Sequence, residues 1–141
     1  EAEWHISSSL ALTGHYAYQH SEYDDLDAVV GHAPGHQLYG DIRWTFAQDW
    51  EVSGQAKWVG DRARDPGDQR QTIDNYTLTS LVLRRSNIVN HLDLSLVVNN
   101  LFNVDAYEPS PGSADIPGGS LVLGDFPLAG RGIYGKIGYR F

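Results

Sequence analysis

Residues 50–58 read WEVSGQAKW, and this stretch decides the fold class. Apolar side chains stand at Trp50, Val52, Ala56 and Trp58. The positions between them hold Glu51, Ser53, Gln55 and Lys57. Alternation with a period of two places successive side chains on opposite faces of an extended chain. The stretch therefore predicts a β-strand with one apolar face and one polar face that carries all of its charge.

The same alternation recurs along the chain, whereas a helical period of 3.6 residues is not found. Six strands are predicted, at residues 6–18, 38–46, 50–58, 72–84, 92–99 and 133–141. In the fourth strand two faces compete, because Tyr76, Leu78 and Val82 alternate with Leu81 and Leu83. The sequence leaves open which of these sets lies on the apolar face.

The predicted strands are long enough to cross a bilayer, which takes about 9–11 residues in a tilted strand. Strands of soluble proteins are shorter, about 5–6 residues. Long connections at 21–35, 61–71 and 103–130 alternate with short ones at 47–49 and 85–90. Outer-membrane barrels show this asymmetry, with the long loops outside the cell. An even number of strands would place both termini on the periplasmic side.

Aromatic side chains near the predicted strand ends agree with the girdles of a membrane barrel. They are Tyr16, Tyr18, Phe46, Trp50, Trp58 and Tyr139. The alternative is that the same side chains form the core of a soluble sheet.

The charge of the chain bears on its partners. The net charge is −8, which argues against nucleic acid because phosphate binding needs a basic surface. Eight acids in two long connections equal this excess: Glu22, Asp24, Asp25, Asp27, Asp105, Glu108, Asp115 and Asp125. Charge runs of this kind are usually solvated surface loops. Cysteine is absent, so disulfides and thiolate chemistry are excluded.

Six spanning strands are too few for a closed barrel, since bacterial single-chain barrels begin at about eight. An open sheet edge in hydrocarbon would leave backbone groups unpaired at several kcal/mol each. We therefore expect further strands before Glu1. Residues 1–141 would then be the C-terminal part of a larger barrel domain. No signal peptide is visible at the start of the chain.

Several short motifs stand at the starts and ends of the predicted strands from Ala33 onward. The first is Ala33-Pro34-Gly35-His36, before the second predicted strand. The others are Trp58-Val59-Gly60-Asp61-Arg62, Asn75-Tyr76-Thr77-Leu78, Val98-Asn99-Asn100-Leu101-Phe102-Asn103-Val104-Asp105-Ala106-Tyr107, Gly130-Arg131 and the terminal Phe141. In this order they resemble the C-terminal third of the barrel of a TonB-dependent outer-membrane receptor. Asn103 stands where that family usually has Asp, and Pro127 and Arg131 are separated by three residues instead of one.

This resemblance implies an all-β, antiparallel barrel of about 22 strands filled by an N-terminal plug. It implies active uptake of a scarce small-molecule ligand, most often a ferric siderophore, with TonB contacting the plug and not this segment. Further implied partners are outer-membrane lipid, lipopolysaccharide and the insertion machinery, which recognises a terminal aromatic residue such as Phe141. The motif residues serve barrel architecture in this family, not catalysis.

Candidate ligand contacts are His15, Arg43 and Lys57 on the polar faces, and His32 and His36 in the first long connection. A helical metal pair at His32 and His36 is disfavoured, because Ala33-Pro34-Gly35 interrupts any helix. No hydrolase elbow, EF-hand loop or phosphate loop is present. The sequence therefore predicts neither an enzyme nor a cofactor or metal site. A second hypothesis is a small self-contained outer-membrane barrel or a soluble β-module that binds carbohydrate.

Overall fold

The computed structural model describes residues 1–24, 28–89, 91–112, 120, 122 and 124–140. These residues contain strands and turns and no helix. The strands are β1 (Ala2–Ser7), β2 (Leu10–Tyr18), β3 (Glu22–Tyr23), β4 (Ala28–Val29), β5 (Pro34–Ala47), β6 (Trp50–Arg62), β7 (Tyr76–Arg85), β8 (Leu92–Asn99), β9 (Tyr107–Glu108), β10 (Phe126–Pro127) and β11 (Gly132–Tyr139). No described helix has the length and hydropathy needed to cross a membrane.

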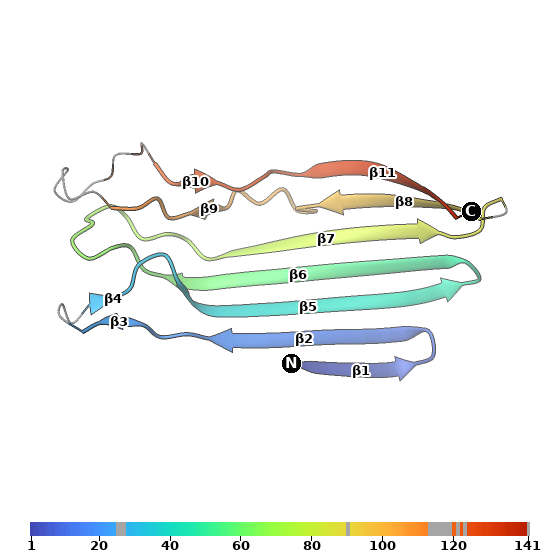
Figure 1. Cartoon of the computed structure of the whole chain (residues 1–141), viewed down its shortest axis with the longest axis horizontal. Coiled ribbons are helices and arrows are strands. Elements are labelled where there is room, and N and C mark those ends of the chain that lie inside the picture. Colours follow the sequence, from blue (N-terminus) through green and yellow to red (C-terminus); the bar gives the residue numbers. More distant parts are fainter. Residues whose placement is uncertain (25–27, 90, 113–119, 121, 123, 141) are drawn as a thin grey trace.

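Seven strands form one antiparallel sheet in the order β1-β2-β5-β6-β7-β8-β11 (Figure 1). Two further pairs, β3 with β4 and β9 with β10, form small sheets within the connections. The main sheet is open, because β1 and β11 are its two edges and do not pair with each other. The prediction of an all-β antiparallel fold is thus confirmed, while the described strands alone close no barrel.

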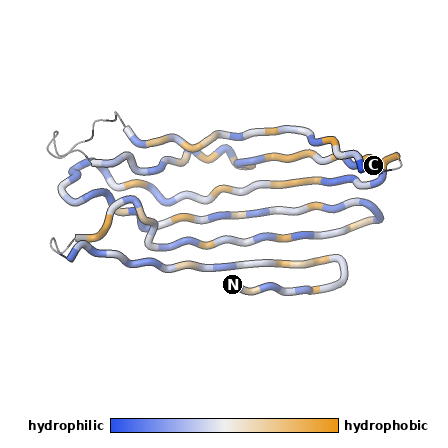
Figure 2. Tube along the Cα trace, in the orientation of Figure 1, coloured by the Kyte–Doolittle hydropathy of each residue, from blue (hydrophilic) through white to orange (hydrophobic). Residues whose placement is uncertain are grey.

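The pairing register separates two faces of the sheet. Residues directly opposite in antiparallel strands share a face, and Figure 2 shows the alternation of hydropathy along the strands. The apolar face carries Leu10, Leu12, Leu38, Ile42, Trp44, Val52, Trp58, Leu81, Leu83, Leu94, Leu96, Ile133 and Ile137. The polar face carries His15, Asp41, Arg43, Glu51, Gln55, Lys57, Arg84, Asp93, Ser95, Asn99 and Lys136. The predicted two-faced strands are therefore confirmed.

The register also assigns the ambiguous strand β7. Leu81 lies opposite Gly54, and Leu83 lies opposite Val52, so both leucines share the apolar face. Leu78 and Val82 lie opposite Lys57 and Ser53 on the polar face. The pairing with the neighbouring strand therefore assigns the apolar face of β7, which the alternation within this strand left open.

The prediction of a single first strand at residues 6–18 is wrong. The chain turns at Ser8 and Ser9, and β1 pairs back on β2 with His5 opposite Ala11. The Ser7 hydroxyl accepts a hydrogen bond from the Ser9 amide at 3.2 Å, which stabilises the turn. The main sheet consequently has seven strands instead of the six expected.

This hairpin also corrects the expected position of the N-terminus. Ala2 lies opposite Gly14, in the middle of β2, and not at the end of the sheet where the C-terminal residues lie. The Arg140 amide donates to the His91 carbonyl oxygen at 3.1 Å, so the end of the chain lies beside the turn between β7 and β8.

The alternation of long and short connections is confirmed. Residues 19–33, 63–75 and 100–131 connect strands at one end of the sheet, and residues 8–9, 48–49 and 86–91 connect them at the other (Figure 1). A small buried cluster lies near the long connections, where Val59, Tyr76 and Ala106 pack together with Leu78, Val104 and Leu128. The side chains of the apolar face are far more exposed, up to 78% for Ile137, so this face requires a cover from outside the described chain.

Candidate functional site

The three long connections meet in one group of polar side chains and one backbone amide, which we call the loop cluster. It contains His32, Arg62, Arg64, Asp65, Asp68, Arg70, Glu108, Ser110, Gly112 and Asp125. Sequence reasoning proposed only His32 and Arg62 from this set. The alternation of acids and arginines in residues 61–70 was the available signal for Arg64, Asp65, Asp68 and Arg70, and the sequence holds no such signal for the members from the third connection.

Asp65 joins the three connections. Its Oδ2 atom accepts hydrogen bonds from His32 Nε2 at 3.0 Å and from the Gly112 amide at 2.8 Å. The His32 Nδ1 atom lies 3.2 Å from the Pro109 carbonyl oxygen. Both partners of His32 are hydrogen-bond acceptors, a carboxylate and a backbone carbonyl. The hydrogen bond from His32 lowers the pKa of Asp65.

The backbone approaches closely at this point. A Cβ atom at Gly31 would lie 2.5 Å from Asp65 Oδ1 and 2.7 Å from the Asp65 amide nitrogen. Glycine is therefore required for the first connection to lie against the second. His32 follows with a positive φ of 70°, an uncommon conformation for a residue other than glycine.

Arginines of the second connection pair with Asp125 of the third connection and with Asp68 of their own. Arg64 binds Asp125 with two parallel hydrogen bonds of 2.8 and 2.7 Å. This bidentate geometry is the strongest form of such a pair, and it lowers the pKa of Asp125 to about 2. Arg70 binds Asp68 at 2.6 Å and the Ser110 hydroxyl at 2.7 Å, and lowers the pKa of Asp68.

Some of the eight acids that equal the net negative charge of the chain therefore contact basic side chains. Asp125 contacts Arg64 of the second connection, Glu108 contacts Arg62 at the end of β6, and Glu22 pairs with His20 at 2.8 Å. Asp24 and Asp105 are exposed. Asp25, Asp27 and Asp115 lie outside the described residues.

The motif residues Trp58, Gly60 and Arg62 act together at the end of β6. A Cβ atom at Gly60 would lie 2.5 Å from Cζ2 of Trp58, so glycine makes room for the indole ring. The Arg62 side chain is fully buried. Its guanidinium donates to the carbonyl oxygens of Asp74 and Tyr107, lies 3.5 Å from Glu108 Oε2 and stacks on the Tyr76 ring at 4.7 Å.

The motif at residues 98–107 ends β8 and starts the last long connection. The Asn100 side chain accepts from the Val104 amide at 2.8 Å and donates to the carbonyl oxygens of Val104 and Ala129. Asn100 and Asn103 both have positive φ values, of 47° and 52°, which asparagine tolerates better than most residues.

The remaining motif residues lie around this turn. The Leu101 amide donates to the Thr79 carbonyl oxygen, and Phe102 is exposed. Asn103 Oδ1 accepts from the Arg131 amide at 3.0 Å, and a Cβ atom at the adjacent Gly130 would make an ordinary contact of 3.6 Å with that oxygen. The Asp that is usual at position 103 could accept the same bond. Phe141 lies outside the described residues.

The structure distributes the candidate ligand contacts over three places. His15, Arg43 and Lys57 lie on the polar face, where the His15 and Tyr39 rings stack at 4.9 Å. His32 belongs to the loop cluster. His36 lies on the apolar face, where its Nδ1 atom is 2.6 Å from the Tyr16 hydroxyl. His32 and His36 therefore do not act as a pair.

The polar face has one further feature that a ligand or another segment could contact. A hollow of about 290 Å³ is lined mainly by hydroxyl and amide side chains and by Lys136. The polar residues around it are Ser53, Gln55, Ser80, Ser95, Asn99 and Tyr134. Within the described part of the chain, no group of three or more acids and histidines is arranged to hold a metal ion.

The strands are long and antiparallel, with one apolar and one polar face, tight turns at one end and interlocked long loops at the other. These features are typical of the barrels of outer-membrane proteins. Solved structures agree with this class. The chain is similar to a mutant of the ferric enterobactin receptor PfeA from Pseudomonas aeruginosa, a TonB-dependent receptor, with a TM-score of 0.74 and 19% identity over 96% of this chain. A second mutant of that receptor, in complex with enterobactin, gives a TM-score of 0.73 and 16% identity over 97% of this chain.

These similarities are at the level of the fold. The chain spans about a fifth of the length of the receptor, 20% and 21% in the two structures. No protein-family model and no curated protein sequence matched the chain. The predicted resemblance to a TonB-dependent receptor is confirmed at the level of the fold.

Proposed function

We propose that residues 1–141 form the C-terminal part of the barrel of a TonB-dependent outer-membrane receptor, which takes up a scarce small-molecule ligand. The observation that carries this proposal is the match of nearly the whole chain to one part of the ferric enterobactin receptor. The motifs at Arg62 and Asn100 support it, because both hold the last long connection against the sheet. We assign no catalytic step to the chain.

In this proposal the apolar face of the sheet contacts lipid and the polar face lines the lumen. Aromatic rings near both ends of the strands support that orientation. Tyr16 and Tyr18 lie toward the long connections, while Trp44, Phe46 and Trp50 lie toward the short ones. The long connections would then be extracellular, and the end of β11 would be periplasmic.

We propose that the lumen is occupied by an N-terminal plug outside residues 1–141. The polar hollow beside Ser95, Asn99 and Lys136 offers hydrogen-bond donors and acceptors to such a plug. TonB would contact the plug and not this segment. Earlier strands would pair with the edges of the sheet at β1 and β11. Lipopolysaccharide would surround the extracellular rim, and the insertion machinery would act on β11.

For the ligand we propose a ferric siderophore, bound from outside by the long connections. The named receptor supports this substrate class by analogy. On the polar face, His15, Arg43 and Lys57 are candidate contacts along the path. The interlocked loop cluster would give the binding surface a fixed shape, because its ion pairs join all three connections.

The test is uptake by the full-length protein that carries this chain, expressed in a bacterial strain without its own siderophore receptors. We expect radioactive iron to enter with at least one ferric siderophore, and uptake to stop when TonB is deleted. A folded protein in the outer membrane that transports no siderophore would refute the ligand class. Recovery of the protein in the soluble fraction would refute the membrane assignment.

A further inference from the structure

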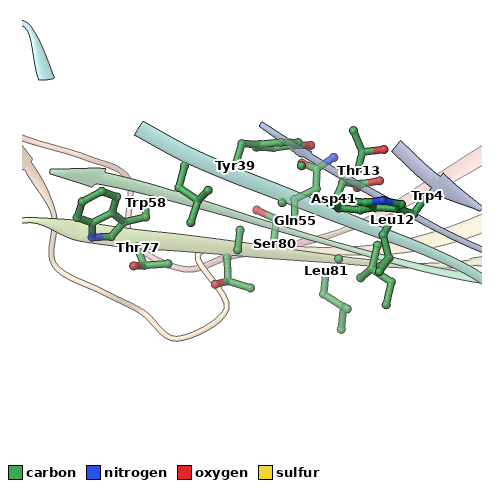
Figure 3. Close-up of a pocket in the computed structure, with 17 residues that line it drawn as sticks. Trp4, Leu12, Thr13, Tyr39, Asp41, Gln55, Trp58, Thr77, Ser80 and Leu81 are labelled. Atoms are coloured by element: carbon green, nitrogen blue, oxygen red, sulfur yellow. The ribbon is translucent and has the colours of Figure 1, made fainter. Parts of the chain in front are cut away.

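A small pocket of about 140 Å³ lies where the first long connection meets the sheet. Residues from the end of β2, from β4, from the start of β5 and from the end of β6 line it. A larger hollow of about 790 Å³ lies on the apolar face, where Leu81 and Thr77 line it while Tyr39 and Gln55 point to the other face (Figure 3). Apolar walls accept any apolar group, so that hollow identifies no ligand. The small pocket differs, because it contains a charge.

Backbone hydrogen bonds fix the shape of the small pocket. The Gln19 amide donates to the Gly35 carbonyl oxygen at 2.9 Å. The Val30 amide donates to the Ser21 carbonyl oxygen at 2.8 Å. These two bonds close the base of the first long connection against the start of β5. The pocket is therefore formed before any ligand arrives, as is usual for small-molecule sites.

Asp61 supplies the charge of the pocket. Its amide donates to Asn75 Oδ1 at 3.1 Å, and its φ is positive, at 55°. Gly35 makes room for its carboxylate, because a Cβ atom there would lie 2.7 Å from Asp61 Oδ2. Within the described residues this carboxylate accepts no hydrogen bond and forms no ion pair. It differs in this from Asp65 and Asp125 of the loop cluster, and it is available to a ligand.

The rest of the lining fits a short alkyl chain that ends in a positive group. Val29, Val30 and Ala33 offer apolar contacts. The volume of about 140 Å³ holds about four or five groups of the size of a water molecule. His20 also lines the pocket, but its Nε2 atom lies 2.8 Å from a carboxylate oxygen of Glu22, which offsets any charge on the imidazole. An ammonium group has three donors and no acceptor, and it forms strong hydrogen bonds to a carboxylate.

We propose that this pocket binds a primary ammonium group on a short alkyl chain, carried by the small-molecule ligand that the long connections capture. The inference rests on the proposed uptake function and adds the charge of one arm of the ligand. Asp61 pairs with the ammonium group, and the two valines contact its methylene groups. In the proposed orientation the pocket lies on the extracellular side, so it contacts the ligand before transport. Asp61 is then a residue that determines specificity.

The first test uses the full-length protein in detergent micelles and two photoreactive probes of equal size. One is a four-carbon chain with a diazirine that ends in an ammonium group, and the other ends in a hydroxyl group. After irradiation and digestion, mass spectrometry locates the adducts. We expect the ammonium probe to label Val29, Val30 and Asp61 about fivefold more than the hydroxyl probe does. Equal labelling of the pocket by the two probes overturns the proposal.

An ammonium group also occurs on the ethanolamine headgroups of lipids, and competition separates the two sources. Glycerophosphoethanolamine carries a phosphate beside its ammonium group, and this phosphate is repelled by the carboxylate of Asp61. It should therefore compete with the ammonium probe less than butylammonium does. Equal or stronger competition would assign the pocket to a lipid headgroup and overturn the proposal.

The second test removes the charge. Asp61→Asn keeps the size of the side chain, and asparagine tolerates the positive φ. We expect it to reduce labelling of Val29 and Val30 by the ammonium probe to the level of the hydroxyl probe. Asp105→Asn, the same change at an exposed carboxylate outside the pocket, should leave this labelling unchanged. Unchanged labelling in Asp61→Asn overturns the proposal. If that variant does not fold, Gly35→Ala replaces it, because the added Cβ atom displaces the Asp61 carboxylate.

The third test separates this inference from the uptake function. It compares the uptake of a ferric trihydroxamate siderophore that has a free terminal amine with that of its N-acetylated form, which lacks the charge. We expect the amine form to enter about fivefold faster at low concentration, and the ratio to fall below about twofold in Asp61→Asn. Equal uptake of both forms by the unmodified protein overturns the ammonium site and leaves the uptake function intact. Uptake of neither form counts against the proposed ligand class, and the labelling of the pocket then decides this inference.

Discussion

Arg62 concentrates several contacts in one buried side chain. Its guanidinium joins the second connection at Asp74 to the third at Tyr107 and Glu108. Its Nε atom is buried without a hydrogen-bond partner among the described residues. A buried charge of this kind tolerates the loss of its partners poorly, and its own loss leaves carbonyl oxygens unpaired.

We therefore expect Arg62→Ala to lower the free energy of unfolding by about 3 kcal/mol or more. The measurement is urea unfolding of the full-length protein in detergent micelles, followed by the gel shift between folded and unfolded barrel. Arg131→Ala is the matched control, since Arg131 is exposed and its contact to Asn103 uses only the backbone amide. That change should cost less than about 0.5 kcal/mol. Equal losses in the two variants would contradict the anchoring role of Arg62.

Asn100 combines a positive φ with three side-chain hydrogen bonds. Asn100→Gly removes the hydrogen bonds but tolerates the backbone conformation, and should cost about 1–3 kcal/mol. Asn100→Ala should cost about 1 kcal/mol more, because alanine is strained at positive φ. The same urea unfolding measures both. If the alanine variant were as stable as the glycine variant, backbone strain would not contribute at this turn.

The sequence located these residues through their motifs but not their partners. Arg62 contacts residues 12 and 45 positions further on, and no local pattern encodes such distances. Asp65, which joins all three connections, belongs to no motif of the chain. Its role depends on Gly31 and Gly112 approaching it from other connections.

The strands show where alternation succeeds and where it fails. It identified β5, β6, β8 and β11, because each has one clearly apolar face. It missed the turn between β1 and β2, because Ser7 and Ser9 fit the polar face of a continuous strand and the turn lacks glycine, proline and asparagine. In β7 both faces carry apolar residues. On the polar face, Leu78 packs against the small buried cluster, and Val82 lies opposite Ser53.

At the end of β11 the last strand is held by a second polar group. Asp93 of β8 accepts from Arg84 of β7 at 2.7 Å, from Arg140 at 3.3 Å and from the Asn87 amide at 3.1 Å. Asp93→Asn would remove the charge that pairs with both arginines. We expect the amides of residues 136–140 to exchange with deuterium about tenfold faster, equal to roughly 1.4 kcal/mol of local stability.

The control for this prediction is Asp41→Asn, which removes a carboxylate from the same face of the sheet at β5, far along the strand order from β11. It should leave exchange in residues 136–140 unchanged. Hydrogen exchange with mass spectrometry of the full-length protein reports both variants. Uniform acceleration across the whole chain in Asp93→Asn would indicate global destabilisation in place of a local clamp.

The described residues form a single-layered sheet, with the three long connections and their loop cluster at one end. The class of fold followed from strand length, alternation and the asymmetry of the connections. The ion pairs between the long connections could not be predicted in this way, because they depend on how the sheet brings the ends of these connections together. The arginines at 62, 64 and 70 all lie in or next to the second connection, which stands between the other two in the structure.

The loop cluster should loosen in acid. Its carboxylates at Asp65, Asp68 and Asp125 have pKa values lowered by their partners, to about 2 for Asp125. A group with a lowered pKa in the folded state contributes stability above its ordinary value of 3.8, and this contribution is lost as the pH falls toward the folded value. We therefore expect the connections to remain joined at about pH 5 and to separate between about pH 4 and 2.

Spin labels on introduced cysteines at exposed Gln69 and Asp105 would measure this separation, because the chain has no cysteine of its own. The distance distribution should be narrow at about pH 5 and broaden toward pH 2. Asp125→Asn removes the carboxylate with the lowest pKa, and should broaden the distribution already at pH 5 and weaken its dependence on acid. A narrow distribution that persists at pH 2 in the unmodified loops would mean that backbone contacts, and not these ion pairs, hold the connections together.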